Sequence, residues 1–404
     1  MFRLPCALFL LVLIPSLSSC TRNSGYRQSE ALTVEKRESG AVLGHVEFDD
    51  QGELISTRQL NQVTEKIRSE STEPMLLLVY IHGWNHNASG KWITGNSDLV
   101  DFRETLDKLA KVTRRKTMGV FVSWRGRTYA PLPVGVDYFH RHAAARRVGG
   151  VSGTEVLYEL GMTARKANRG NRVLMVGHSL GGAVLESAMA EAVAAQVATA
   201  KAKGETLKRT DFPADLAISL NSAESAMTAR KLLATFKRRG IRDVEGGPVM
   251  VSLTSQRDII TSVFWPIGNF LGRYVPGFNW FNTGVAGTYR KDPDGNKLRG
   301  TQGQAHRTTV GHFKPFFSHE AQMVAREPRD LAAILKDNRQ ARRGDGFIVK
   351  GEKEVFLFSR PNEPYYNDTP YWVVPIPGEF INDHWDQWNG NFIGLMTALM
   401  SMAK

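Results

Sequence analysis

The sequence predicts an α/β fold with a doubly wound, mostly parallel sheet. Six short apolar runs are spaced along the chain, and stretches rich in helix-forming residues separate them. The runs are continuously apolar, which is typical of strands covered by helices on both faces. Helices between strands imply parallel crossovers. The 404 residues, of which 42% are hydrophobic and 23% charged, suit a globular protein with one large α/β domain and insertions, or with two domains.

The predicted strands are, in chain order, residues 75–81, 118–124, 172–176, 216–220, 249–253 and 372–376. Residues 42–48 would add an antiparallel strand at one edge. Residues 183–200 are rich in alanine and predict a helix after the third strand, and residues 388–402 predict an amphipathic C-terminal helix. We therefore expect the domain to span residues 41–404.

The stretch before the last strand is longer than a crossover needs, so residues 262–368 or so are predicted as an insertion. It carries many aromatic residues, and a hairpin is expected from Phe347 to Val374. These aromatic residues form either a lid or acyl-binding wall over a site, or the core of an inserted subdomain. The aromatic positions are Phe264, Trp265, Phe278, Trp280, Phe281, Phe313, Phe316 and Phe317.

The third strand runs into a G-x-S-x-G motif formed by Gly177, Ser179 and Gly181. In a nucleophile elbow of this kind, the turn from strand to helix is so sharp that glycines flank the serine. The serine hydroxyl is then open to a base, and the first amides of the helix face a developing oxyanion. Ser179 is therefore the predicted nucleophile. The alternative is a glycine-rich turn without chemistry.

Three histidines follow the motif in places that suit a general base, since the expected chain order is serine, acid, histidine. His384 lies between the last predicted strand and the last predicted helix, and it is the expected base. His312 and His319 are the alternatives, in an aromatic-rich segment that would otherwise pack over the site.

The expected acid is Asp258, which lies just past the strand at residues 249–253. Its task would be to hold the imidazole tautomer and to stabilise the imidazolium. Glu224, after the preceding strand, is the alternative. Asp383 and Asp386 flank His384 and are expected to cap the last helix.

A His-Gly-Trp-Asn-His-Asn segment begins at His82, directly after the first buried strand. A loop at this place supplies one backbone N–H of the oxyanion hole, and the residue after the nucleophile supplies the other. The expected donors are Trp84, or alternatively Asn85, and Leu180. The competing interpretation treats His82 and His86 as metal ligands, because two histidines four apart resemble zinc sites. A structural role for His82 within the loop is favoured.

Together these motifs resemble the α/β-hydrolase superfamily, in particular a poorly characterised group of lipase- and esterase-like proteins with the same two segments. The resemblance covers roughly residues 75–260 and 370–404. It implies a catalytic triad of Ser179, His384 and Asp258, hydrolysis of carboxylic esters, and no metal or organic cofactor. Acyl transfer by the same triad remains an alternative, as does a catalytically silent envelope protein that binds a ligand.

The N-terminus predicts export. Residues 1–19 contain one arginine and an apolar stretch well short of the roughly 20 residues that span a bilayer, as in a secretory signal peptide. The segment ending in Cys20 resembles the lipobox of bacterial lipoproteins, which implies lipid attachment at Cys20 and a polar tether over residues 20–40. The alternative is an ordinary signal peptide with an incidental cysteine. Thr21 at the next position resembles lipoproteins sorted to the outer membrane of the bacterial envelope.

The formal net charge of +12 favours contact with anionic surfaces such as lipid headgroups. The basic residues are dispersed in small clusters along the chain, and no zinc finger or phosphate-cradling glycine loop accompanies them. The expected partners are therefore an ester or lipid substrate and a membrane reached through the N-terminal lipid, with no specific nucleic acid. The sequence does not predict an oligomeric state.

Overall fold

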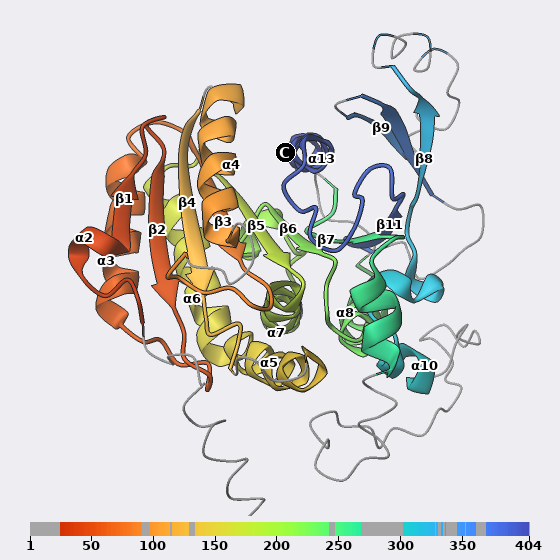
Figure 1. Cartoon of the computed structure of the whole chain (residues 1–404), viewed down its shortest axis with the longest axis horizontal. Coiled ribbons are helices and arrows are strands. Elements are labelled where there is room, and N and C mark those ends of the chain that lie inside the picture. The colour runs from red at the N-terminus through yellow and green to blue at the C-terminus, as the bar shows by residue number, and fades with distance from the viewer. Residues whose placement is uncertain are drawn as a thin grey trace, which may run out of the picture.

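The computed structural model describes residues 25–90, 97–113, 115–128, 134–241, 247–267, 302–327, 329, 333, 336, 346–351, 353–360 and 369–403. The expected signal peptide, Cys20 and the start of the expected tether lie outside these residues. Within them, an eight-stranded, mostly parallel sheet carries helices on both faces, and a small antiparallel sheet lies beyond its C-terminal edge strand (Figure 1). The predicted α/β fold class is confirmed.

The large sheet has the strand order β1-β2-β4-β3-β5-β6-β7-β11, and every pairing in it is parallel except that of β1 with β2. Because parallel strands end at the same edge, the loops that follow them gather there. The strands are β1 (Val34–Lys36), β2 (Val42–Glu47), β3 (Met75–Ile81), β4 (Lys116–Ser123), β5 (Arg172–His178), β6 (Leu216–Leu220), β7 (Met250–Ser255) and β11 (Tyr371–Ile376).

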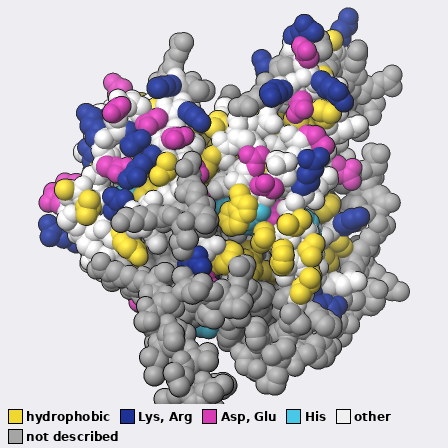
Figure 2. Space-filling view, in the orientation of Figure 1, with side chains coloured by type: hydrophobic (Ala, Val, Ile, Leu, Met, Phe, Trp, Pro, Cys, Tyr) yellow, Lys and Arg dark blue, Asp and Glu magenta, His cyan; other side chains and the backbone are white. Residues whose placement is uncertain are grey.

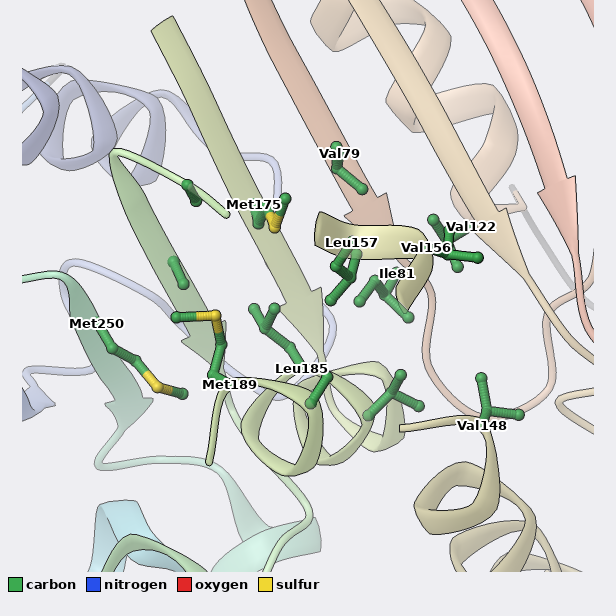
Figure 3. Close-up of a cluster of buried hydrophobic side chains, with 14 of the residues drawn as sticks. Val79, Ile81, Val122, Val148, Val156, Leu157, Met175, Leu185, Met189 and Met250 are labelled. Carbon is green, nitrogen blue, oxygen red and sulfur yellow. The ribbon is translucent and has the colours of Figure 1, made fainter. Parts of the chain in front are cut away.

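Helices cover both faces of this sheet because its strands are apolar on both faces. Leu77 and Val79 of β3 belong to one buried cluster, and their neighbours Leu76 and Leu78 belong to another. The first cluster packs under α3 (Thr57–Glu70), α5 (Val134–Val148), α6 (Val151–Ala167), α7 (Leu180–Lys203) and α8 (Ala226–Arg238), and Figure 3 shows part of it. The second packs under α4 (Asp98–Thr113) and α13 (Gly390–Met402).

The expectation that residues 42–48 form an antiparallel edge strand is wrong. β2 pairs in parallel with β4, with Val42 opposite Met118, and all of its residues are buried. The antiparallel edge is β1, which shields the outer side of β2. The short strand β1 was missed because it lies in a polar stretch with no clear alternation.

Residues 25–40, which the sequence assigns to a tether, contact the domain. The backbone amides of Tyr26 and Arg27 donate to the carboxylate of Glu47, at 2.8 and 2.7 Å. The short helix α2 (Glu30–Thr33) and β1 follow. This segment is polar because it binds through its backbone and through ion pairs such as that of Glu35 with Arg103, at 2.6 Å.

The described part of the insertion begins with a π-helical turn, η2 (Ile260–Phe264), and continues with α10 (Gln302–Arg307), η3 (Val310–His312) and η4 (Lys314–Phe316). Its small antiparallel sheet consists of β8 (Glu320–Ala325), β10 (Val355–Ser359) and β9 (Gly346–Lys350), in this order. The hairpin predicted from residue 347 to residue 374 is shorter in the structure: β9 pairs with β10, which ends at Ser359, and β11 joins the large sheet. Phe278, Trp280 and Phe281 lie outside the described residues.

Candidate active site

The turn between β5 and α7 places Ser179 in a strained backbone conformation, with φ of 55° and ψ of −118°. The flanking glycines are required by space. A Cβ on Gly177 would lie 2.4 Å from the carbonyl oxygen of Gly181, and one on Gly181 would lie 2.1 Å from the carbonyl oxygen of Ile81. The close approach of backbone to backbone thus holds the serine at the start of α7, as in a nucleophile elbow.

Three side chains that are far apart in the sequence meet at this turn. The Oγ atom of Ser179 lies 2.8 Å from Nε2 of His384, and Nδ1 of His384 lies 2.9 Å from Oδ2 of Asp258. All three residues are buried. Because a carboxylate can only accept, Nδ1 of His384 carries its proton, and Nε2 is left to accept the hydroxyl proton of Ser179. The arrangement is that of a nucleophile, a base and an orienting acid.

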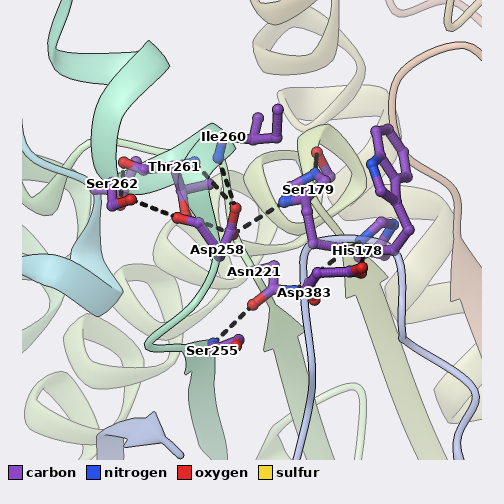
Figure 4. A network of polar contacts seen from close by, with 12 residues as sticks. His178, Ser179, Asn221, Ser255, Asp258, Ile260, Thr261, Ser262 and Asp383 are labelled. Carbon is purple, nitrogen blue, oxygen red and sulfur yellow. Dashed lines mark hydrogen bonds and ion pairs between the residues drawn. The ribbon is translucent and has the colours of Figure 1, made fainter. Parts of the chain in front are cut away.

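Asp258 is held as a carboxylate by donors from the turn that follows it. Its Oδ1 accepts from the amides of Ile260 and Thr261, at 2.9 and 3.2 Å, and its Oδ2 accepts from the Thr261 hydroxyl at 2.5 Å (Figure 4). Burial alone would raise the pKa of Asp258. The charge on His384 and the hydrogen bonds from His384 and Thr261 outweigh burial and lower this pKa below its usual value. Asp258 therefore stays ionised beside the imidazole.

The loop after β3 lies directly against the nucleophile. A Cβ on Gly83 would lie 2.9 Å from Cβ of Ser179, so only glycine fits there. The loop is fixed by Trp84, whose indole N–H donates to Asp137 at 3.0 Å, and by Asn85, whose amide donates to the carbonyl oxygen of Gly126 at 2.9 Å. Trp84 thus follows the residue that touches Ser179.

Leu180, the other expected oxyanion donor, is the first residue of α7. The first amides of a helix have no acceptor within the helix and point away from its end. The loop that carries Trp84 and the start of α7 that carries Leu180 are thereby both next to Ser179, which is the placement that an oxyanion hole requires.

The two histidines of the loop after β3, His82 and His86, form hydrogen bonds within the protein. The ring of His82 bridges the loop and β4. Its Nδ1 is 2.9 Å from the carbonyl oxygen of Gly83, and its Nε2 is 3.0 Å from the hydroxyl of Ser123. The amide of Asp98 donates to Nδ1 of His86 at 3.2 Å. Burial lowers the pKa of His82 to about 4 and that of His86 to about 3, so both are neutral at pH 7.

The alternative base and acid candidates lie elsewhere. His312 contacts Thr261, with Nε2 3.0 Å from the hydroxyl, and therefore supports Asp258 from behind. His319 packs on Trp372, with ring centroids 4.2 Å apart. Glu224 faces His142, with Oε2 3.4 Å from Nε2, and does not reach His384.

Three residues around the site were not singled out from the sequence. Thr261 donates to Asp258, and Asn221 and His178 both contact the loop that carries His384. Asn221 directly follows β6 and has a φ of 47°. An asparagine at the end of a buried strand is the one sequence signal that would have identified it, because asparagine tolerates the left-handed region.

Among the described residues, no group of three or more histidine, cysteine, aspartate or glutamate side chains could hold a metal ion. In the same part of the chain, no helix is long and apolar enough to cross a membrane. The chain matches no protein family model, no curated protein and no solved structure. The geometry of the site is therefore the basis for any functional assignment.

Proposed function

We propose that the protein is a serine hydrolase of the α/β-hydrolase type that cleaves carboxylic esters. The observation that carries the proposal is the unbroken chain of contacts from Ser179 through His384 to Asp258, with separations of 2.8 and 2.9 Å. The site is buried, and a low dielectric strengthens each of these contacts. No cofactor is needed for this chemistry.

In the proposed reaction, Oγ of Ser179 attacks the ester carbonyl while its proton passes to Nε2 of His384. Asp258 stabilises the imidazolium that forms. The amides of Leu180 and Trp84 bind the oxyanion of the tetrahedral intermediate. Its C–O bond then breaks, the leaving alkoxide takes the proton from Nε2, and an acyl-enzyme ester remains on Ser179. Water deprotonated by His384 hydrolyses this ester by the reverse sequence.

An apolar acyl group suits the surroundings of the site. Most of the large hydrophobic side chains that are exposed in the described residues come from two segments, one directly after Asp258 and one directly after His384. Figure 2 shows hydrophobic side chains gathered next to histidine on one face of the molecule. Such a surface favours esters with a hydrocarbon part over strongly polar ones. The exposed hydrophobic residues of these two segments are Ile259, Val263, Phe264, Ile267 and Trp385.

The bacterial cell envelope is the proposed location, with a lipid on Cys20 as the anchor. This part of the proposal is supported by the apolar N-terminal segment and by the absence of any cysteine after Cys20 in the sequence. A protein exported with a single, acylated cysteine needs no protection from disulfide exchange. An ester substrate in or near a membrane would be within reach of an anchored enzyme.

A fluorophosphonate probe tests the proposed activity directly, because it phosphonylates an activated serine and the adduct can be located by peptide mass spectrometry. The wild-type protein should be labelled at Ser179 and should hydrolyse a short p-nitrophenyl ester. Ser179→Ala should abolish labelling and lower kcat by about 10⁴ or more, since only the oxyanion hole and substrate binding would remain. Wild-type protein that is folded but not labelled, or labelled at another serine, would refute the proposal.

Ser262→Ala is a suitable control for this experiment. Ser262 is near the site, but its hydroxyl donates to the main-chain carbonyl of Asp258, at 2.6 Å, rather than to a reacting group. The labelling of this variant should remain close to that of wild type.

A further inference from the structure

The main-chain carbonyl of His384 accepts hydrogen bonds from two buried side chains. Nε2 of His178 lies 2.7 Å from this oxygen, and Nδ2 of Asn221 lies 3.2 Å from it. The same amide group of Asn221 also donates to the carbonyl oxygen of Asp383 at 3.2 Å. The backbone at His384 is therefore fixed by hydrogen bonds of its own, independently of the contacts that the imidazole ring makes.

Asn221 is itself fixed by the neighbouring strand. The backbone N–H of Asn221 donates to the carbonyl oxygen of Leu253 at 2.8 Å. Its side-chain Oδ1 accepts from the backbone N–H of Ser255 at 2.9 Å (Figure 4). Its φ of 47° is a left-handed conformation that costs about 1–3 kcal/mol for a residue other than glycine. Because both its backbone N–H and its Oδ1 are bonded to β7, the side chain of Asn221 has a single orientation, with Nδ2 directed at the loop that carries His384.

His178 precedes the nucleophile on β5, and its ring is fully buried. Burial, followed by the charge of His384, lowers the pKa of His178 to about 4, so the ring is neutral at pH 7. Because a carbonyl oxygen can only accept, its proton sits on Nε2, where it serves the hydrogen bond to His384. Since His178 is the last residue of β5 and Ser179 directly follows it, this bond joins the segment of the nucleophile to the loop of the base.

We propose that His178 and Asn221 are positioning residues, which hold the main-chain carbonyl of His384 so that its imidazole stays between Ser179 and Asp258. This inference rests on the proposed hydrolase activity. The segment between β11 and α13 has no helix or strand of its own, so side-chain contacts must fix the backbone of His384. Misplacing a catalytic group by about 1 Å can reduce the rate about 100-fold.

The test compares variants that remove these donors with a matched control. Asn221→Gly deletes the amide group while relieving the positive φ, and His178→Phe keeps a ring of similar size without a donor. His178→Gln restores an amide N–H near the position of Nε2. The control is Asn171→Ala, because the side chain of Asn171 is also buried and also makes three hydrogen bonds, at 2.8, 2.9 and 2.8 Å, but lies at the opposite end of β5.

For Asn221→Gly and His178→Phe, kcat of the folded protein should fall about 10- to 100-fold while KM stays within about twofold of wild type. The rate of fluorophosphonate labelling should fall in parallel, and His178→Gln should recover most of it. Asn171→Ala should lower Tm and leave kcat unchanged. If the two site variants keep wild-type kcat below their melting temperatures, or change only KM, the positioning role is overturned.

A measurement without turnover separates this result from failure of the proposed activity. The proton on Nδ1 of His384, hydrogen-bonded to Asp258 at 2.9 Å, should give a strongly downfield NMR resonance in wild-type protein. It should weaken or shift upfield in Asn221→Gly and persist in Asn171→Ala. An unlabelled wild-type Ser179 would refute the hydrolase proposal, whereas an unchanged resonance in Asn221→Gly would refute only the positioning.

Discussion

Glu186 of α7 is expected to destabilise the protein as the pH rises, and Glu186→Gln should remove this effect. Its side chain is fully buried and accepts from the hydroxyl of Ser219 at 2.5 Å. Burial raises its pKa from 4.5 to about 8; the hydrogen bond from Ser219 opposes this rise, and the charge of Glu224 adds to it. The glutamate is thus protonated in the folded protein at pH 7 and ionised in the unfolded chain.

The sign and size of the effect follow from this difference in pKa. Between pH 4.5 and pH 8 the folded state binds the proton that the unfolded state has lost, so stability falls as the pH rises through this window. A pKa raised from 4.5 to about 8, at about 1.4 kcal/mol per pH unit, corresponds to at most about 5 kcal/mol at pH 8 and about 3 kcal/mol at pH 7. A glutamine cannot ionise and loses nothing over this range.

Urea unfolding at pH 5, 6, 7 and 8 measures the effect, with the free energy of unfolding of each variant compared at each pH. The advantage of Glu186→Gln over wild type should grow by several kcal/mol from pH 5 to pH 8. Glu191→Gln is the control, since Glu191 is an exposed glutamate on the same helix. If the difference between Glu186→Gln and wild type does not change with pH, the carboxyl group is ionised in the fold and the reasoning fails.

Two further predictions concern the base and the anchor. His384→Ala should reduce kcat about as much as loss of Ser179, whereas His312→Ala, which removes only a contact to Thr261, should reduce kcat less. Steady-state kinetics of the two variants measure this difference. If His312→Ala has the larger effect, the base lies in the insertion. Cys20→Ser should release the protein from the membrane fraction or leave its signal uncleaved, and a chain that begins after residue 25 should be soluble and active on a short ester. Mass spectrometry of the native N-terminus checks the anchor, and an unmodified Cys20 would contradict it.

The strands that hold the site could be predicted because burial on both faces leaves a plain signal. Residues 75–81 and 216–220 coincide with β3 and β6. β4, β5 and β7 extend beyond their predicted apolar runs because polar residues at strand ends also join the ladder, as Lys116 and His178 do. The motif order then predicted the meeting of Ser179, Asp258 and His384, since the carboxyl ends of parallel strands share one edge.

The contacts around these three residues could not be predicted in the same way. The bond from Asn221 to His384 joins positions 163 residues apart, and the burial of Glu186 depends on strands that are remote from it in the chain. Neither has a local pattern, because a single polar residue on an apolar surface looks the same whether it faces solvent or a partner. Such contacts follow from packing and are visible only in the folded chain.

The pairing of β11 with β7 has a consequence for when the protein can act. His384 lies eight residues beyond the end of β11, and its partners Ser179 and Asp258 precede it by 205 and 126 residues. When Ser179 and Asp258 have been synthesised, His384 has not yet been made. Until β11 docks beside β7, with Tyr371 opposite Met250, the nascent chain has no means of activating its serine. Under the proposed function, the site would therefore stay inactive until the residues through His384 have been made and β11 has paired with β7.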